Sequence, residues 1–192
     1  HGNSAQSGGW NSPEMSDKTT NALIRKHGLK KWYTMMYRSV ASFEAMTKDT
    51  EGEIIRSMVE GNVLELGCGD QKTVPDSTGV DFYGKGEIIP TINRVSVADI
   101  KSSVTDMPKS IGKFDAIIAR HLLEHLIDPI EALRHWAEFL TPEGKIIVAV
   151  PDNRIVDGVP MNPEHVHAFK ASSLMNIFKS AGLSAEFKDS GN

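Results

Sequence analysis

The sequence predicts an α/β fold in which helices cover both faces of a mostly parallel sheet. From residue 62 onward, short apolar segments alternate with amphipathic helical segments, as in parallel strands joined by right-handed crossovers. In addition, residues 61–70 read GNVLELGCGD, so an apolar strand runs directly into a glycine-rich turn. Together these features predict a three-layer sandwich with a ligand site beyond the carboxyl ends of its strands.

Three parts are expected along the chain. Residues 1–15 are rich in Gly, Ser and Asn and are expected to be a disordered tail or a leftover of cloning. Residues 16–60 are predicted to form an N-terminal helical cap, and residues 61–192 the domain that contains the sheet. Within the cap, the apolar spacing and the capping residues predict helices over residues 16–27, 31–47 and 53–59.

The elements of the main domain follow from its apolar runs. Strands are predicted over residues 62–66, 77–80, 94–97, 114–119 and 145–150, and helices over 126–140 and 170–180. The connection over residues 69–78 is too short for a full crossover helix, so we expect a single helical turn there or none. A last strand is expected to begin at Leu183.

Composition narrows the class of protein. The net charge of −4 argues against non-specific electrostatic binding of nucleic acid. The chain has one cysteine, Cys68, which excludes an internal disulfide and fits a reducing compartment. No apolar run is long enough to cross a bilayer and no signal peptide is visible. We therefore expect a cytoplasmic protein without a membrane partner.

The charges around the glycine turn predict its ligand. A dinucleotide site needs neutral donors for a pyrophosphate, whereas here Glu65 precedes the turn and Asp70 follows it. Two carboxylates suit a ligand that carries an ammonium and a sulfonium, which is S-adenosylmethionine. Asp81 ends the second predicted strand, where an acid can accept hydrogen bonds from two ribose hydroxyls. A nicotinamide-dependent oxidoreductase is accordingly disfavoured.

An ordered series of motifs resembles the class I S-adenosylmethionine-dependent methyltransferases over residues 53–183. The motifs are Glu65-Leu-Gly-Cys-Gly69, Val80-Asp81, Ala98-Asp99, Phe114-Asp-Ala-Ile-Ile118, Leu123-Glu-His-Leu126 and Leu140-Thr-Pro-Glu-Gly-Lys-Ile-Ile-Val148. The short first crossover is most similar to members that act on small molecules or sugars. The resemblance implies a Rossmann-like fold and S-adenosylhomocysteine as the product.

That family's sheet usually ends in an antiparallel hairpin, and this chain has room for only its first strand. We therefore expect the final strand to be missing, and three explanations stay open. The chain is truncated, a partner supplies the strand, or the N-terminal segment replaces it.

The resemblance also assigns cofactor-binding residues. The backbone of Gly67, Cys68 and Gly69 would face the methionine part of the cofactor. Glu65 would orient the turn and face the ammonium through water, or else it only satisfies loop amides. Asp81 would bind the ribose.

The adenine and the ammonium have further candidates. Phe82 would cover the adenine, or else belong to the core. Asp99 would accept the adenine amino group and the backbone of Ile100 would meet the ring edge; alternatively, Asp99 caps a turn with Ser102. The carbonyls of Ala119 and Arg120 would accept from the ammonium, while the Arg120 side chain could turn toward an anionic substrate or toward Glu124.

Three histidines are candidate general bases for the transfer: His121, His165 and His167. His125 is expected to be structural, with its ring bonded to backbone. His165 and His167 with Glu164 and Asp152 also invite a metal interpretation, but no spacing matches a known metal motif, so no metal is expected.

The function predicted from the sequence is in-line methyl transfer to a small-molecule or sugar-like acceptor, most readily at oxygen. Two alternatives stay open: a catalytically silent S-adenosylmethionine-binding module that acts with a partner, and methylation of RNA or protein. Assembly into a homo-oligomer also stays open.

Overall fold

The computed structural model describes residues 49–154, 162 and 164–187. The tail over residues 1–15 and the helices predicted over 16–27 and 31–47 lie outside these ranges. The described part forms a compact unit of its own from Asp49 onward. Within it, no helix is both long enough and apolar enough to cross a membrane.

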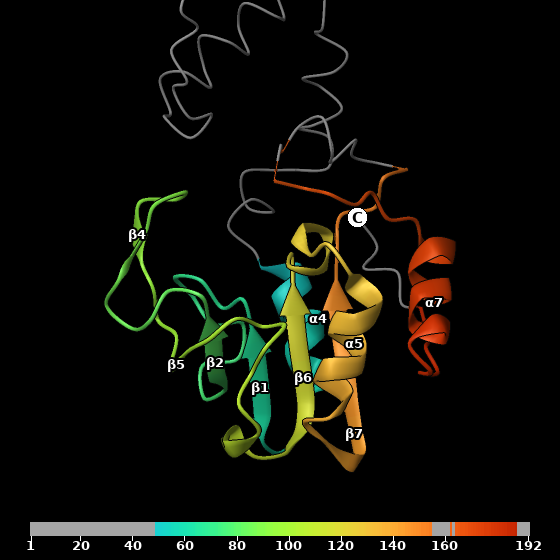
Figure 1. The fold of residues 1–192 in the computed structure, drawn as a ribbon, viewed down its shortest axis with the longest axis horizontal. Coiled ribbons are helices and arrows are strands. Elements are labelled where there is room, and N and C mark those ends of the chain that lie inside the picture. Colours follow the sequence, from blue (N-terminus) through green and yellow to red (C-terminus); the bar gives the residue numbers. More distant parts are fainter. Residues whose placement is uncertain (1–48, 155–161, 163, 188–192) are drawn as a thin grey trace, which may run out of the picture. The chain divides into compact units, whose positions relative to one another are not determined.

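Five parallel strands form the central sheet in the order β5-β2-β1-β6-β7 (Figure 1). Their bounds are β1 Val63–Leu66, β2 Thr78–Asp81, β5 Ile100–Lys101, β6 Phe114–Arg120 and β7 Leu140–Ala149. The strand order reverses beside β1, whose neighbours are β2 and β6. This reversal places the carboxyl ends of β1, β2 and β6 together, where open α/β sheets bind their ligands.

Helices cover both faces of this sheet (Figure 1), which confirms the predicted three-layer α/β sandwich. Helix α4 (Thr50–Met58) lies on one face, while α5 (Pro129–Ala137) and α7 (Ala171–Ser180) lie on the other. Alternate side chains of β6 supply the two apolar layers. Ala116 and Ile118 pack with Ile55 of α4, whereas Ile117 and Ala119 belong to the core that contains Trp136 of α5.

Local sequence explains where the helices begin. Asp128 accepts hydrogen bonds from the amides of Ile130 and Glu131, and Pro129 occupies the first turn of α5. Asp49 caps α4 in the same way through the Gly52 amide at 3.1 Å. The predicted helices over residues 53–59, 126–140 and 170–180 are therefore confirmed in kind, with α5 shorter than expected.

The connection from β1 to β2 contains no helix, which is one of the two alternatives expected for this short segment. Strand β7 begins earlier than predicted because Leu140 already pairs with Phe114. The register then shifts, so that Ala116 pairs with Lys145.

The strand predicted over residues 94–97 is wrong as a member of the central sheet. Arg94–Val95 form β4, which pairs antiparallel with β3 (Ile88–Ile89) in a separate hairpin. The strand was expected from an apolar run, yet Val95 is 54% exposed. The strand beside β2 is β5 instead.

The strand expected from Leu183 is also not found over residues 183–187, because the Leu183 amide closes the end of α7 by donating to the Phe178 carbonyl.

Candidate active site at the carboxyl ends of the strands

The glycine turn after β1 has the geometry expected from its sequence. Gly67 and Gly69 have φ values of 65° and 56°, a region that favours glycine. The Gly67 amide donates to the Val80 carbonyl at 2.8 Å, which ties the turn to β2. A Cβ on Gly67 would lie 3.0 Å from Leu122, whereas one on Gly69 would meet nothing within 4 Å among the described residues. The turn therefore opens at Gly69 onto space that a ligand can occupy.

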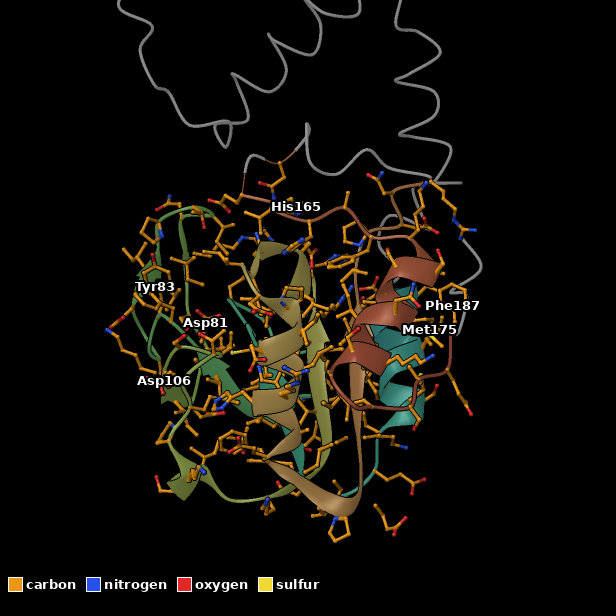
Figure 2. The ribbon with its side chains drawn as sticks, turned by 45° about the vertical axis from the view of Figure 1, so that its right-hand side comes forward. Asp81, Tyr83, Asp106, His165, Met175 and Phe187 are labelled. Atoms are coloured by element: carbon orange, nitrogen blue, oxygen red, sulfur yellow. The ribbon has the colours of Figure 1, made fainter. Side chains whose placement is uncertain are left out.

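Asp81 lies at the end of β2 and points toward this turn (Figure 2). Its Oδ2 accepts from the Gly69 amide at 3.0 Å and its Oδ1 from the Tyr83 amide at 3.1 Å. Two backbone donors thus hold the carboxylate in one orientation. Each oxygen keeps a further lone pair for a hydroxyl donor, so the geometry is compatible with the ribose role expected for Asp81.

Glu65 does not orient the glycine turn. Its side chain is 3% exposed, and its two oxygens accept from the amides of Thr73 and Val74 and from the Ser77 hydroxyl, at 2.6, 3.1 and 3.1 Å. The alternative expectation, that this acid satisfies loop amides, describes what the structure shows. Glu65 therefore organises the helix-free connection from β1 to β2.

Asp70 is also occupied, by the Arg94 guanidinium at 2.8 Å. Both carboxylates that were expected to favour a cationic ligand are therefore bonded within the protein. Among the described acids near the turn, Asp81 is the one whose carboxylate bonds to a backbone amide of the turn.

Cys68 can offer only its backbone to a ligand. The side chain is 4% exposed and packs over Gly79, where an added Cβ would lie 2.8 Å from Sγ. Burial, with the nearby carboxylates of Asp81 and Glu65, raises the pKa of the Cys68 thiol to about 12. The thiol is therefore protonated and inert at neutral pH.

Phe82 follows Asp81 and is 68% exposed, so the alternative that it belongs to the core is wrong. Its ring meets that of Tyr83 edge to face, with centroids 5.4 Å apart. An exposed aromatic ring beside the ribose position is available to cover a flat ligand.

Asp99 and Ile100 do not lie at the carboxyl end of a strand, where the residues that bind adenine were expected. Asp99 precedes β5 instead of following a strand, and its Oδ2 accepts from the Gly79 amide at 2.8 Å and from Lys72. Ile100 lies inside β5, paired with Val80. The residues at the carboxyl end of β5 are Ser102, whose amide donates to the Asp81 carbonyl, and Ser103.

The last two residues of β6, Ala119 and Arg120, were both expected near the ammonium, and their side chains have different surroundings. Ala119 is fully buried in the core, so only its backbone can face a ligand. The Arg120 side chain turns to the start of α4, where it pairs with Asp49 at 2.7 Å and with Glu51. Both alternatives for this guanidinium, an anionic substrate and Glu124, are therefore replaced by an ion pair within the domain.

His121 follows β6 in the left-handed region, with φ of 51° and its amide bonded to the Ala149 carbonyl. Its ring nitrogens lie 3.6 Å from Glu124 Oε1 and 3.1 Å from Glu51 Oε1. These carboxylates, Glu124 foremost, raise the pKa of His121 to about 9. The ring is therefore mostly protonated at neutral pH, which argues against the expected role of His121 as a general base.

His165 and His167 occupy different surroundings. His165 lies beyond the end of β6 (Figure 2), and its ring packs edge to face on that of His125, with centroids 4.6 Å apart. His167 bonds through Nε2 to the Ile127 carbonyl at 3.2 Å. His125 bonds to the Glu164 carbonyl at 3.2 Å, which confirms the ring-to-backbone contact expected of it.

Sequence reasoning missed the roles of Glu51 and Glu124. Glu51 lies in the first turn of α4 and meets both Arg120 and His121. Glu124 is 1% exposed in the 3-10 turn η2 (Leu123–His125). The sequence did contain a signal for Glu124. This acid directly follows the apolar pair Leu122 and Leu123, so a buried carboxylate could have been expected there.

A hollow of about 300 Å³ lies elsewhere, lined by Lys109, Gly112, Lys113, Glu138 and Phe139. It adjoins the amino end of β6, which begins at Phe114. Because ligands of open α/β sheets bind at the opposite edge, we do not count it as part of the site.

Comparison with known proteins agrees with this architecture. A family model described as "Methyltransferase domain" matches residues 43–186. The chain therefore belongs to this family, which confirms the resemblance to class I S-adenosylmethionine-dependent methyltransferases.

A relative from Mycobacterium tuberculosis (strain ATCC 25618 / H37Rv), named "Probable S-adenosylmethionine-dependent methyltransferase", is 25% identical over 139 residues. The match covers 64% of this chain and 48% of the relative, so the chain spans about half the length of the curated relatives it matches.

Two solved structures share the fold. A methyltransferase from Archaeoglobus fulgidus, described as dependent on S-adenosylmethionine, superimposes with a TM-score of 0.55 at 18% identity, covering 79% of this chain and 74% of that one. A second, from Thermotoga maritima, gives a TM-score of 0.53 at 21% identity, with 69% of each chain covered.

Proposed function

We propose that this chain transfers a methyl group from S-adenosylmethionine to a hydroxyl of a small-molecule acceptor. The observation that carries the proposal is the Asp81 carboxylate bonded to the Gly69 amide. This bond joins the acid at the end of β2 to the open side of the glycine turn, in a chain of the methyltransferase family.

In the proposed complex, the backbone of the turn over Gly67–Gly69 faces the methionine part of the cofactor. Asp81 accepts from the two ribose hydroxyls, and Phe82 covers one face of the adenine. Ser102 and Ser103 take the place first assigned to Asp99, because they follow β5 at the same edge of the sheet.

The carbonyls of Ala119 and Arg120 remain our candidates for the cofactor's ammonium, because β6 ends next to β1.

The transfer itself mainly requires alignment. The acceptor oxygen has to approach the methyl carbon to about 3 Å, opposite the sulfur that departs. Charge disappears as the sulfonium becomes a thioether, so a poorly hydrated site does not oppose the reaction. A hydroxyl acceptor must also lose its proton, and His121 is disfavoured as the base because a pKa of about 9 leaves little neutral imidazole at neutral pH.

We propose that His165 and His167 lie near that proton. Glu124 and His125 are neighbours of His165 and belong to the same region. Of the two proposed histidines, His165 lies next to a buried carboxylate, with 4.0 Å between His165 Nε2 and Glu124 Oε1. A small acceptor fits the overall charge of −4 better than an extended nucleic acid does.

Two measurements test the proposal. Calorimetry should detect binding of S-adenosylhomocysteine and none of NAD. A cofactor with a labelled methyl group should transfer the label to a member of a panel of sugars, other hydroxyl compounds, amines, RNA and protein. Tight binding of NAD would contradict the proposed site. Cofactor binding without transfer to any acceptor would contradict the proposed activity and favour a silent binding module.

A further inference from the structure

Glu124 is a buried carboxylate whose oxygens accept no hydrogen bond from the described residues. It is 1% exposed. The imidazole nitrogens of His121 and His165 approach Oε1 only to 3.6 and 4.0 Å, too far for hydrogen bonds. The His121 ring at 3.6 Å offers Glu124 an ion pair without a hydrogen bond, so a closer cation would still stabilise the buried oxygens.

Two imidazoles converge on the same place. Glu124, His125 and His165 each offer a ligand atom, and these atoms lie within 4.8 Å of one another. The rings of His125 and His165 are nearly perpendicular, at 81°. Ligand atoms bound to one ion at about 2.0–2.2 Å lie roughly 3–3.5 Å apart. Small side-chain rotations therefore suffice to bring the three atoms onto one ion.

The backbone holds the two halves of this cluster together. The amides of Val166 and His167 donate to the Glu124 carbonyl at 2.9 and 3.2 Å, so the segment that contains His165 is fixed against η2. This tie joins segments that are far apart in the sequence, and it makes the approach of His165 to Glu124 a feature of the fold.

A further contact sets the state of the His125 ring. Its Nδ1 lies 3.2 Å from the Glu164 carbonyl, across 39 positions of sequence. A carbonyl oxygen only accepts, so Nδ1 carries the proton, and the neutral ring keeps its lone pair on Nε2. A backbone carbonyl that fixes the tautomer in this way is typical of metal-binding histidines.

We propose that Glu124, His125 and His165 bind a divalent first-row transition-metal ion such as Zn²⁺, Mn²⁺ or Co²⁺. Two imidazoles with one carboxylate suit these ions, whereas Mg²⁺ prefers oxygen ligands. The metal interpretation weighed from the sequence combined His165 and His167 with Asp152 and Glu164, which differs from the cluster in the structure. Asp152 pairs with Arg154, and Glu164 contributes its carbonyl and no carboxylate oxygen. Three protein ligands leave coordination positions for water or an acceptor.

The site adjoins the turn proposed to hold the cofactor. Leu122 would touch a Cβ on Gly67, and Glu124 lies two positions after Leu122. If the proposed methyl transfer holds, an acceptor hydroxyl bound to this ion loses its proton to solvent more readily, because a bound cation lowers its pKa. Its oxygen then bonds to the methyl carbon, and the carbon–sulfur bond breaks with its electron pair left on sulfur. This role rests on the proposed function, whereas metal binding itself does not.

The test begins with protein freed of metal by a chelator and titrated with Co²⁺, followed by visible absorption and calorimetry. We expect one ion per chain, with visible bands that indicate nitrogen ligands. Glu124→Gln and His165→Ala should each weaken binding by roughly 100-fold or more, since each removes a direct ligand. His167→Ala, which removes a nearby histidine outside the cluster, should bind Co²⁺ as the unaltered protein does.

Thermal unfolding provides a second readout. Co²⁺ or Zn²⁺ should raise the unfolding temperature of the unaltered protein and leave that of Glu124→Gln unchanged. Circular dichroism shows whether each variant is folded. Because Glu124→Gln keeps the shape of the side chain and removes its charge, it is the decisive variant if His165→Ala fails to fold.

Absence of Co²⁺ and Zn²⁺ binding at millimolar concentration would overturn the metal site, as would equal binding by Glu124→Gln. S-adenosylhomocysteine binding, measured on the metal-free protein, separates the two proposals. If the metal-free protein binds S-adenosylhomocysteine but neither Co²⁺ nor Zn²⁺ binds, the result contradicts the metal site alone. Metal binding to a protein that does not bind S-adenosylhomocysteine contradicts the proposed function alone.

Discussion

The Asp81 carboxylate accepts a hydrogen bond from the Gly69 amide at 3.0 Å, and this contact links the acid at the end of β2 to the turn that follows β1. The two residues are 12 positions apart in the sequence. Because the connection between the strands contains no helix, a short loop organised by Glu65 is enough to bring them together.

The two glycines of the turn should respond differently to alanine. Each substitution forces a side chain into the left-handed region, which costs about 1–2 kcal/mol of folding free energy. In Gly67→Ala the new Cβ also meets Leu122 at 3.0 Å, so we expect the larger fall in stability, measured by urea unfolding. In Gly69→Ala the Cβ enters open space in front of the turn.

Gly69→Ala should therefore bind S-adenosylhomocysteine at least about 10-fold more weakly while it remains folded. Unchanged affinity in this variant would show that the open side of the turn does not face the cofactor.

Phe82→Ala tests the adenine contact. We expect affinity for S-adenosylhomocysteine to fall about 3- to 10-fold, the effect of losing one aromatic contact. Stability should change little, because Phe82 is 68% exposed. Phe187→Ala is a matched control, since this exposed aromatic residue lies away from Asp81 (Figure 2). Equal effects of the two substitutions on affinity would remove Phe82 from the site.

Arg120→Ala should lower the stability of the protein without changing its affinity for S-adenosylhomocysteine. The side chain is 30% exposed and pairs with Asp49 and Glu51, so we expect a loss of about 1–2 kcal/mol in urea unfolding. Lys109→Ala removes a pair in which the lysine is 86% exposed, and its effect should lie within experimental error. A large loss of S-adenosylhomocysteine affinity in Arg120→Ala would indicate that the guanidinium reaches the ligand.

Cys68 should be unreactive in the folded protein. With its pKa raised to about 12, the thiol at pH 8 should react with a disulfide reagent at least about 100-fold more slowly than in urea. The measurement is unambiguous because the chain has one cysteine. Rapid reaction of the native protein would mean that the turn opens readily or that the side chain faces solvent.

Local patterns predicted much of the fold. The apolar runs that became β1 and β6, the proline and acid that begin α5, and the glycine turn all act over a few residues, so their outcome could be read from the sequence. The hairpin β3–β4 escaped prediction because a short strand segment such as Arg94–Val95 does not itself determine its partner, which depends on residues elsewhere.

The side chains of the site were harder to predict than their positions. Asp81 lies where expected, because the end of a strand is a local feature. Glu65 and Asp99 both bond to the loop and strand around β2, which only the folded chain brings close to them. The approach of His165 to Glu124 likewise depends on contacts between distant segments, so spacing alone suggested no metal.

The most direct test of the account is the affinity of Asp81→Asn for S-adenosylhomocysteine, measured by calorimetry beside Asp76→Asn. Asp76 is an exposed acid at the amino end of β2, so its change removes the same charge at the opposite edge of the sheet. We expect Asp81→Asn to bind 10- to 100-fold more weakly, a loss of about 1.4–2.8 kcal/mol, because the amide keeps one accepting oxygen but lacks the charge that strengthens the bonds to the ribose. Asp76→Asn should bind normally. Equal affinity of the two variants would contradict the assignment of Asp81 to the ribose, and with it the proposed site.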